Sequence, residues 1–212
     1  MKVRVNLMDT NKTIRRFASH EEQKAEVYRY WRSRPVGERL AAVWDATAAA
    51  YAFKGIPMTL PEDLKQLLLA FNAHRVEYLI IGGYAVGVYS EPRATKDLDL
   101  FIRSSITNSE AVYRALAAFG APLAGMTPAD FRNDPNAVFQ IGLPPARVDI
   151  LQHISGVTFE EAWEHRTDTS VDGVTTHVIA AEHLIQNKLQ SGRMRDLADV
   201  EAIREANPKK AG

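Results

Sequence analysis

The sequence contains no cysteine, and this absence removes several kinds of chemistry. Disulfide bonds, thiolate catalysis and cysteine-ligated zinc sites are all excluded. Lysine and arginine together number 26, as do aspartate and glutamate, so the chain of 212 residues has no net formal charge. A protein-wide basic field that would attract nucleic acid is therefore absent, although this balance still allows a local basic groove.

Long apolar runs are also missing. No stretch approaches the roughly 20 residues that a transmembrane helix needs, and the first ten residues, MKVRVNLMDT, are too polar for a secretory signal. We therefore expect a cytoplasmic protein with no membrane partner. The length and the hydrophobic content of 46% are typical of one globular domain with a sizeable core and room for an appendage.

Residues 1–55 are predicted to be an N-terminal helical extension after a brief strand at 3–7. Ser19, followed by acidic residues, is typical of a helix N-cap, and Pro35 separates this helix from a second one that begins near Gly37. The two helices predict a hairpin whose aromatic residues pack in a core or against a protein partner or second copy. These aromatic residues are Tyr28, Tyr30, Trp31 and Trp44.

Residues 56–212 are predicted to form the second part, an α/β domain. Apolar runs, alternation and turn residues predict its strands and helices. The predicted strands are 78–81, 97–102, 138–143, 147–152, 167–171 and 174–179, with a three-residue turn at 144–146. The predicted helices begin near 61 and span 84–89, 109–119, 181–191 and 195–206.

Two aspartates alternate with leucine in the predicted strand at 97–102. Successive side chains of a strand point to opposite faces, so Asp97 and Asp99 project together while Leu98 and Leu100 face the other way. Two neighbouring carboxylates repel each other and raise each other's pKa. A sequence that keeps both on an apolar strand indicates a compensating cation, and Mg²⁺ is the natural one because it takes hard oxygen ligands together with substrate phosphates.

A third aspartate, Asp149, lies in the predicted strand RVDIL at 147–151. If this strand pairs beside the first, Asp149 joins Asp97 and Asp99, and three carboxylates can hold two metal ions roughly 3.5–4 Å apart. The alternative is a charge on an edge strand that faces water. The clustering of acids favours the first interpretation, and both stay open at this point.

Gly82 and Gly83 follow the predicted strand at 78–81 and precede a helix. Glycine lets the chain bend sharply and approach a phosphate closely, and a helix N-terminus offers free N–H groups to an anion. A tight turn without a ligand would use the same residues. The spacing does not fit the dinucleotide or P-loop fingerprints, because Tyr84 stands where the first needs glycine and Val88 where the second needs lysine.

The segments IIGGYAV at 80–86 and PRATKDLDL at 92–100 resemble the signature of the nucleotidyltransferase superfamily of the DNA polymerase β type. That signature is an apolar residue, Gly-Gly or Gly-Ser, a spacer, and Asp-x-Asp on a strand, and the spacer here is long. The family's third carboxylate corresponds to Asp149. The resemblance implies an α/β or α+β fold with a short mixed sheet, two Mg²⁺ ions (with Mn²⁺ as a substitute) on the three aspartates, and transfer of a nucleotidyl group.

The C-terminal segment LIQNKLQSGR at 184–193 resembles the last helices of small bacterial members, some of which are toxins of toxin–antitoxin pairs that act on RNA. The resemblance implies that Lys188 binds the triphosphate and that Asp196 lies near the site. The alternative is an exposed helix on which Arg195 and Asp199 pair at i,i+4.

Arg93 stands just before the aspartate pair, and a guanidinium there can bind a phosphate or neutralise the carboxylates. With Gly82, Gly83 and Lys188 it completes the predicted nucleotide site. The sequence thus predicts a Mg²⁺-dependent enzyme that transfers a nucleoside monophosphate from ATP or another triphosphate to a hydroxyl of an RNA such as tRNA, a protein or a small molecule. The alternative is a non-catalytic nucleotide-binding or antitoxin-like interaction protein with a degenerate form of this fold.

Overall fold

The structure is a computed structural model that describes residues 17, 19–53, 60–142 and 147–208. The predicted strand at 3–7 and the predicted turn at 144–146 lie outside the described residues. The helices are α1 (His20–Arg32), α2 (Val36–Phe53), α3 (Leu60–Ala73), α4 (Gly82–Tyr89), α5 (Ile106–Phe119), α6 (Asp130–Asn133), α7 (Phe159–Glu164), α8 (Ala181–Ser191) and α9 (Met194–Ala206). The strands are β1 (Tyr78–Ile80), β2 (Asp97–Ile102), β3 (Val138–Ile141), β4 (Arg147–Leu151), β5 (Thr167–Val171) and β6 (Val174–Val178). None of the described helices has the length and apolar character needed to cross a membrane.

Six strands of the described chain form one mixed sheet in the order β3-β4-β2-β1-β6-β5. β2 runs parallel to β4 and β1 runs parallel to β6, whereas the other neighbours are antiparallel. A parallel pair needs a crossover connection, and α5 and α6 lie in the chain between β2 and β4. The predicted α+β class with a mixed sheet is confirmed.

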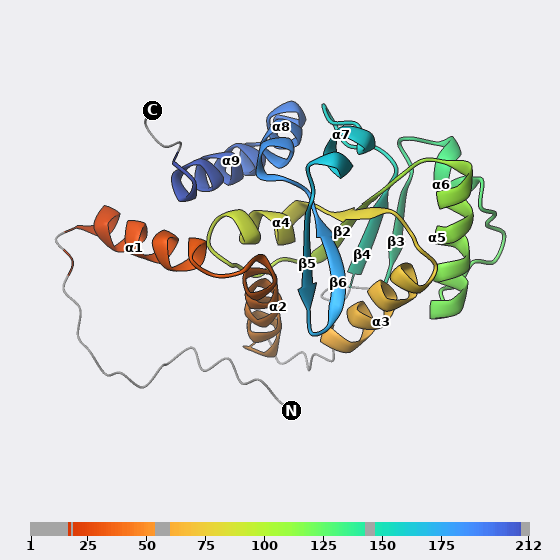
Figure 1. Cartoon of the computed structure of the whole chain (residues 1–212), viewed down its shortest axis with the longest axis horizontal. Helices are drawn as coiled ribbons and strands as arrows, with labels where there is room; N and C mark the ends of the chain where they lie inside the picture. Colours follow the sequence, from red (N-terminus) through yellow and green to blue (C-terminus); the bar gives the residue numbers. More distant parts are fainter. Residues whose placement is uncertain (1–16, 18, 54–59, 143–146, 209–212) are drawn as a thin grey trace.

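The helices gather on two sides of the molecule (Figure 1). α3, α5 and α6 lie on one side, while α1, α2, α4, α8 and α9 lie on the other. Strand β1 is central and buries all three of its side chains, as expected for a strand with neighbours on both edges. In β2, Leu98 and Leu100 are buried while Asp97 and Asp99 stay partly exposed, so the predicted alternation is confirmed.

The two N-terminal helices diverge, and the predicted hairpin between them is wrong (Figure 1). α2 packs its apolar side against the domain, where the Trp44 ring meets Tyr84 edge-to-face at 6.1 Å between centroids. α1 instead lies against α9, where Lys24 binds Glu205 at 2.5 Å. The core placement of Trp44 is thereby confirmed, and the boundary at residue 55 stays a prediction.

Local hydrogen bonding explains where the observed elements differ from the predicted ones. α5 starts at Ile106, three residues early, because the Ser105 side chain accepts a hydrogen bond from the backbone of Asn108 and caps the helix. α7 was not predicted, although Thr158 and Glu161 form a reciprocal capping box at its start. α8 ends at Ser191, as predicted, and Gly192 follows it in the left-handed conformation.

Candidate active site

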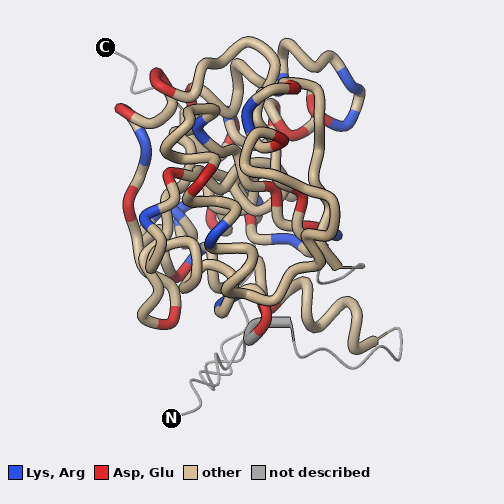
Figure 2. Tube along the Cα trace, turned by 90° about the vertical axis from the view of Figure 1, so that its right-hand side faces the viewer, with Lys and Arg blue, Asp and Glu red and all other residues tan. Residues whose placement is uncertain are grey.

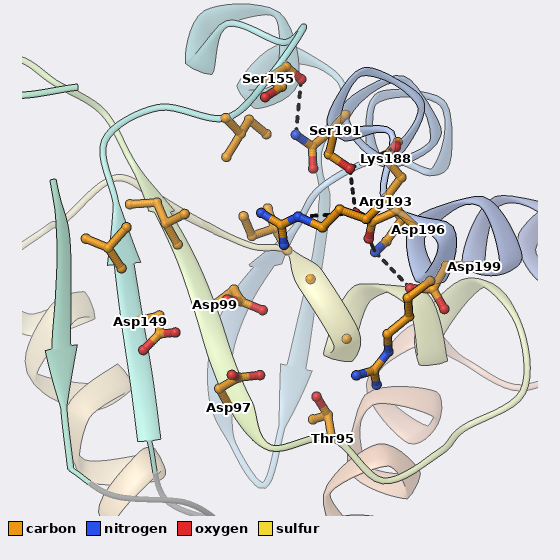
Figure 3. Close-up of a pocket in the computed structure, with 18 of the residues that line it drawn as sticks. Thr95, Asp97, Asp99, Asp149, Ser155, Lys188, Ser191, Arg193, Asp196 and Asp199 are labelled. Atoms are coloured by element: carbon orange, nitrogen blue, oxygen red, sulfur yellow. Dashed lines mark hydrogen bonds and ion pairs between the residues drawn. The ribbon is translucent and has the colours of Figure 1, made fainter. Parts of the chain in front are cut away.

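A cavity of about 530 Å³ lies beside the sheet, between β2, β4 and the α8–α9 corner. Figure 3 shows its two walls: aspartates of the sheet on one side, and Lys188, Asp196 and Asp199 of the helices on the other. Acidic and basic residues are interspersed along the described part of the Cα trace (Figure 2), and residues of both charges also line this cavity.

The pairing of β2 with β4 brings the three predicted aspartates together. Asp99 lies directly opposite Asp149 in the parallel register, and Asp97 lies opposite Arg147. All three carboxylates line the cavity and point into it (Figure 3). The edge-strand alternative for Asp149 is wrong, because β4 is covered on both edges by β2 and β3 and the Asp149 residue is only 9% exposed.

The carboxyl group of Asp99 is electrostatically costly in its ionised form. Burial, followed by the negative charges of Asp97 and Asp149, raises its pKa from 3.8 to about 7. Gly82 packs against this carboxyl group, since a Cβ built on Gly82 would stand only 1.8 Å from Asp99 Oδ2. The glycine turn and the acidic strand are therefore in direct contact, as the predicted motif requires.

Gly82 has no room for a side chain and also has a left-handed φ of +61°. Gly83, at the start of α4, is also tightly packed, with 2.4 Å between a built Cβ and Thr95 Oγ1. The turn therefore packs on the acidic strand and the loop before it, and Gly82 and Gly83 line the same cavity as the three carboxylates. A phosphate bound there would lie near both the N-terminus of α4 and the three aspartates.

Replacing Gly82 with alanine is expected to displace the Asp99 carboxylate and to lower any transfer activity by roughly 100-fold, the usual cost of misplacing a catalytic group by about 1 Å. The matched control is Gly120→Ala, because Gly120 also has a positive φ, +87°, but has open space around it. Activity assays and unfolding curves on both variants check this. Equal activity of the two variants would show that contact with Asp99 is unimportant.

Arg147, which the sequence did not single out, neutralises two of the three aspartates. Its Nη2 donates to Asp97 Oδ2 and also to Asp149 Oδ2, the latter at 3.0 Å. Gln140 of β3 donates to the other Asp149 oxygen at 3.2 Å. Arg147 is two residues before Asp149 on one strand, so the same-face rule that found Asp97 and Asp99 could have found it.

The helical wall of the cavity is a second charge network. Lys188 Nζ binds Asp196 Oδ1 at 2.7 Å and Asp199 Oδ2 at 2.8 Å, and its side chain is only 9% exposed. Arg93 also binds Asp199. Burial alone would raise the pKa of Asp196, but hydrogen bonds from Lys188 and Ser191 outweigh it and lower that pKa.

Two sequence interpretations change at this wall. Arg93 pairs with Asp199 and not with the aspartate pair it precedes, because Arg147 already holds Asp97. Asp199 is buried at 7% exposure, which contradicts the exposed helix proposed as the alternative. Lys188 and Arg93 do line the same cavity as the three aspartates. Their binding of a triphosphate stays a prediction.

The aspartate cluster suits a divalent cation in its donor chemistry. Three carboxylates on one wall are the hard oxygen ligands that Mg²⁺ takes, and burial, followed by the charges of Asp97 and Asp149, raises the pKa of Asp99 in spite of the nearby Lys188 and Arg147. Among the residues that the structure describes, no three acidic or histidine side chains already converge closely enough to hold a metal ion. The cluster would have to close around the cation on binding.

The mixed sheet, the Gly-Gly turn and the three aspartates are consistent with a member of the nucleotidyltransferase superfamily. The chain belongs to the family described as "Nucleotidyl transferase of unknown function (DUF2204)", whose match covers residues 61–212. That match contains the whole sheet and every residue of the cavity named above. Comparison with curated proteins gave no significant match.

Proposed function

We propose that this protein transfers a nucleoside monophosphate from a nucleoside triphosphate, such as ATP, to an acceptor hydroxyl. The observation that carries the proposal is the contact of Gly82 with Asp99 in the same cavity in which Asp99 lies opposite Asp149. A phosphate-approaching turn, a row of carboxylates and cationic side chains on the facing wall are the parts that this reaction needs.

Asp97, Asp99 and Asp149 would hold one or two Mg²⁺ ions, with Mn²⁺ as a substitute. When bound, such ions neutralise charge on the phosphates and polarise the attacking oxygen. The three ligands come from two adjacent strands, so their backbone positions are fixed by the sheet before substrate arrives. Only side-chain rotation is then needed to complete the site.

The triphosphate would lie between the N-terminus of α4 and the wall of α8 and α9. Lys188 and Arg93 are the cations of that wall, and both line the cavity. The acceptor oxygen attacks the α-phosphorus, the bond from that phosphorus to the bridging oxygen breaks, and pyrophosphate leaves. The acceptor proton passes to Asp149, unless Asp149 is a metal ligand throughout, in which case water takes it.

The acceptor is an RNA such as tRNA, a protein or a small molecule. The sequence resemblance to toxin–antitoxin members favours an RNA or a protein, and membership of a toxin–antitoxin pair is part of the proposal. The zero net charge disfavours a large nucleic acid bound by overall charge. A cytoplasmic location follows from the substrate, since nucleoside triphosphates are held there.

The test is pyrophosphate release from each of the four triphosphates in turn, with Mg²⁺ and candidate acceptors present. We expect release with at least one triphosphate, loss of release in EDTA, and recovery on adding Mg²⁺ or Mn²⁺. An α-labelled triphosphate should leave its label on the acceptor. Absence of both signals with every triphosphate and acceptor class would contradict the proposal.

The competing function is a nucleotide-binding or interaction protein without catalysis. The contact of Arg147 with Asp97 and Asp149 is the observation that favours it, since it neutralises acids that catalysis needs. Equilibrium binding separates the two: a binding module would take up a labelled triphosphate and release it unchanged.

A further inference from the structure

Arg147 lies where a cation would have to enter. Its Nη2 contacts one oxygen of Asp97 and one oxygen of Asp149, and these are two of the three side chains proposed as metal ligands. Residues 97 and 147 are also direct partners in the register of β2 and β4, so the contact follows from the sheet pairing and not from a flexible loop. In this state the guanidinium supplies the positive charge that the two carboxylates need.

The arginine contact accounts for the arrangement of the acids. Within the described residues the carboxylates share one cavity without converging into a metal cluster. A guanidinium nitrogen hydrogen-bonds a carboxylate oxygen at an N···O distance of roughly 2.7–2.9 Å, whereas Mg²⁺ requires metal–oxygen distances of roughly 2.1 Å. Oxygens held by Arg147 therefore lie further from their shared partner than they would from a bound Mg²⁺ ion. A cation can therefore take the two oxygens that Arg147 holds, Asp97 Oδ2 and Asp149 Oδ2, only after Arg147 withdraws.

Arg147 uses only some of its N–H donors in these contacts. One nitrogen, Nη2, makes both contacts, and the buried Nε has no hydrogen-bond partner among the described residues. A guanidinium offers five N–H donors in a planar fork that fits phosphate oxygens as well as carboxylates. The side chain lines the cavity and keeps 26% of its surface exposed, so it can turn toward a ligand there.

We propose that Arg147 is a built-in competitor of the divalent cation, which holds Asp97 and Asp149 in the metal-free protein and releases them when a triphosphate offers it anionic oxygens. Metal and nucleotide then bind together, and metal alone binds weakly. The inference rests on the proposed function for the identity of the nucleotide, but the competition with metal does not need turnover.

The test measures Mn²⁺ binding to the full chain by electron paramagnetic resonance, without nucleotide and then with a non-hydrolysable triphosphate analogue. We expect Arg147→Gln to bind Mn²⁺ alone roughly tenfold more tightly than wild type, because no guanidinium has to be displaced. The analogue should tighten Mn²⁺ binding at least about tenfold in wild type and much less in the variant, since the coupling is reciprocal.

Arg103→Gln is the matched control. Arg103 also binds two carboxylates, those of Glu77 and Glu160, and its side chain is 23% exposed against 26% for Arg147. The Arg103→Gln variant loses the same charge but keeps every contact of the cavity aspartates, so its Mn²⁺ affinity should equal that of wild type. Similar tightening in both variants would show a diffuse charge effect and overturn the proposal.

An Arg147→Gln variant that binds Mn²⁺ as weakly as wild type, or more weakly, also overturns the proposal, because Arg147 would then position the carboxylates for the metal. If that variant does not fold, Arg147→Lys provides the measurement: its single ammonium group holds fewer oxygens at once, and we expect a smaller tightening of the same sign. Normal pyrophosphate release with unchanged Mn²⁺ affinity would refute the competition and leave the proposed function intact.

Discussion

Replacing Asp99 with asparagine should abolish nucleotidyl transfer and, at about pH 8, make the metal-free protein more stable than wild type. Transfer should fall by roughly 10³-fold or more, because an amide cannot supply the charged oxygen that a divalent cation needs. Stability should rise because the asparagine removes a buried negative charge that faces Asp97 and Asp149. Opposite effects on function and stability are typical of a strained active site.

The sign of the pH effect follows from the pKa of Asp99, which is about 7 in the folded protein and 3.8 as its ordinary value. Between these values the folded state holds a proton that the unfolded state has lost, so stability falls as pH rises through this window. The full difference corresponds to at most about 4 kcal/mol. Because Asp99 is partly open to the cavity, we expect a loss of about 2 kcal/mol from this group.

Urea unfolding in EDTA at about pH 5 and about pH 8 measures this effect, and Asp63→Asn on the exposed start of α3 is the control. Wild type and the control should lose stability between the two conditions, and Asp99→Asn should lose less. Excess Mg²⁺ together with a non-hydrolysable triphosphate analogue should restore the stability of wild type at the higher pH and do much less for Asp99→Asn. A variant that is less stable than wild type at both pH values would mean that the Asp99 charge is not costly.

Replacing Lys188 with methionine is expected to destabilise the protein by about 3 kcal/mol, because it leaves the buried carboxylate of Asp199 and the partly buried one of Asp196 without their shared cation. Lys188 Nζ lies 2.7 Å from Asp196 and 2.8 Å from Asp199, and the two aspartate side chains are only 14% and 10% exposed. Methionine keeps the length of the side chain, so the loss reports charge and not a cavity. Chemical unfolding measures it.

Lys24→Met is the control, because Lys24 also binds a carboxylate, that of Glu205, but on an exposed surface where both side chains are more than 40% exposed. We expect little change there, since exposed ion pairs contribute little. The Lys188 variant should also raise KM for the triphosphate if Lys188 reaches the phosphates. An unchanged KM together with lost stability would restrict Lys188 to a structural role.

Local patterns in the sequence were enough to predict most of the secondary structure. The bounds of β2, β5 and α8 agree with the predicted ranges because alternation, the Asp172-Gly173 turn and the stop at Gly192 are encoded within a few residues. The short helices α6 and α7 were missed because they are too short to show a helical period.

The sequence also determined which acidic residues could take part in the candidate active site. Asp97 and Asp99 had to share a face because the side-chain period of a strand is two, and Gly82 can take its left-handed φ of +61° because glycine has no Cβ. These properties depend only on neighbours along the chain. The family signature was readable for the same reason, since it lies within one short segment.

Tertiary structure alone decided how distant charges are paired. Whether Asp149 faced Asp99 or water depended on the pairing of β4 with β2, which are about 50 residues apart. The same pairing places Arg147 next to Asp97, and the packing of α9 places Asp199 where it forms ion pairs with Arg93 and Lys188. Charge partners are chosen by proximity in space, and a single sequence contains no local signal for contacts made across a sheet or between helices.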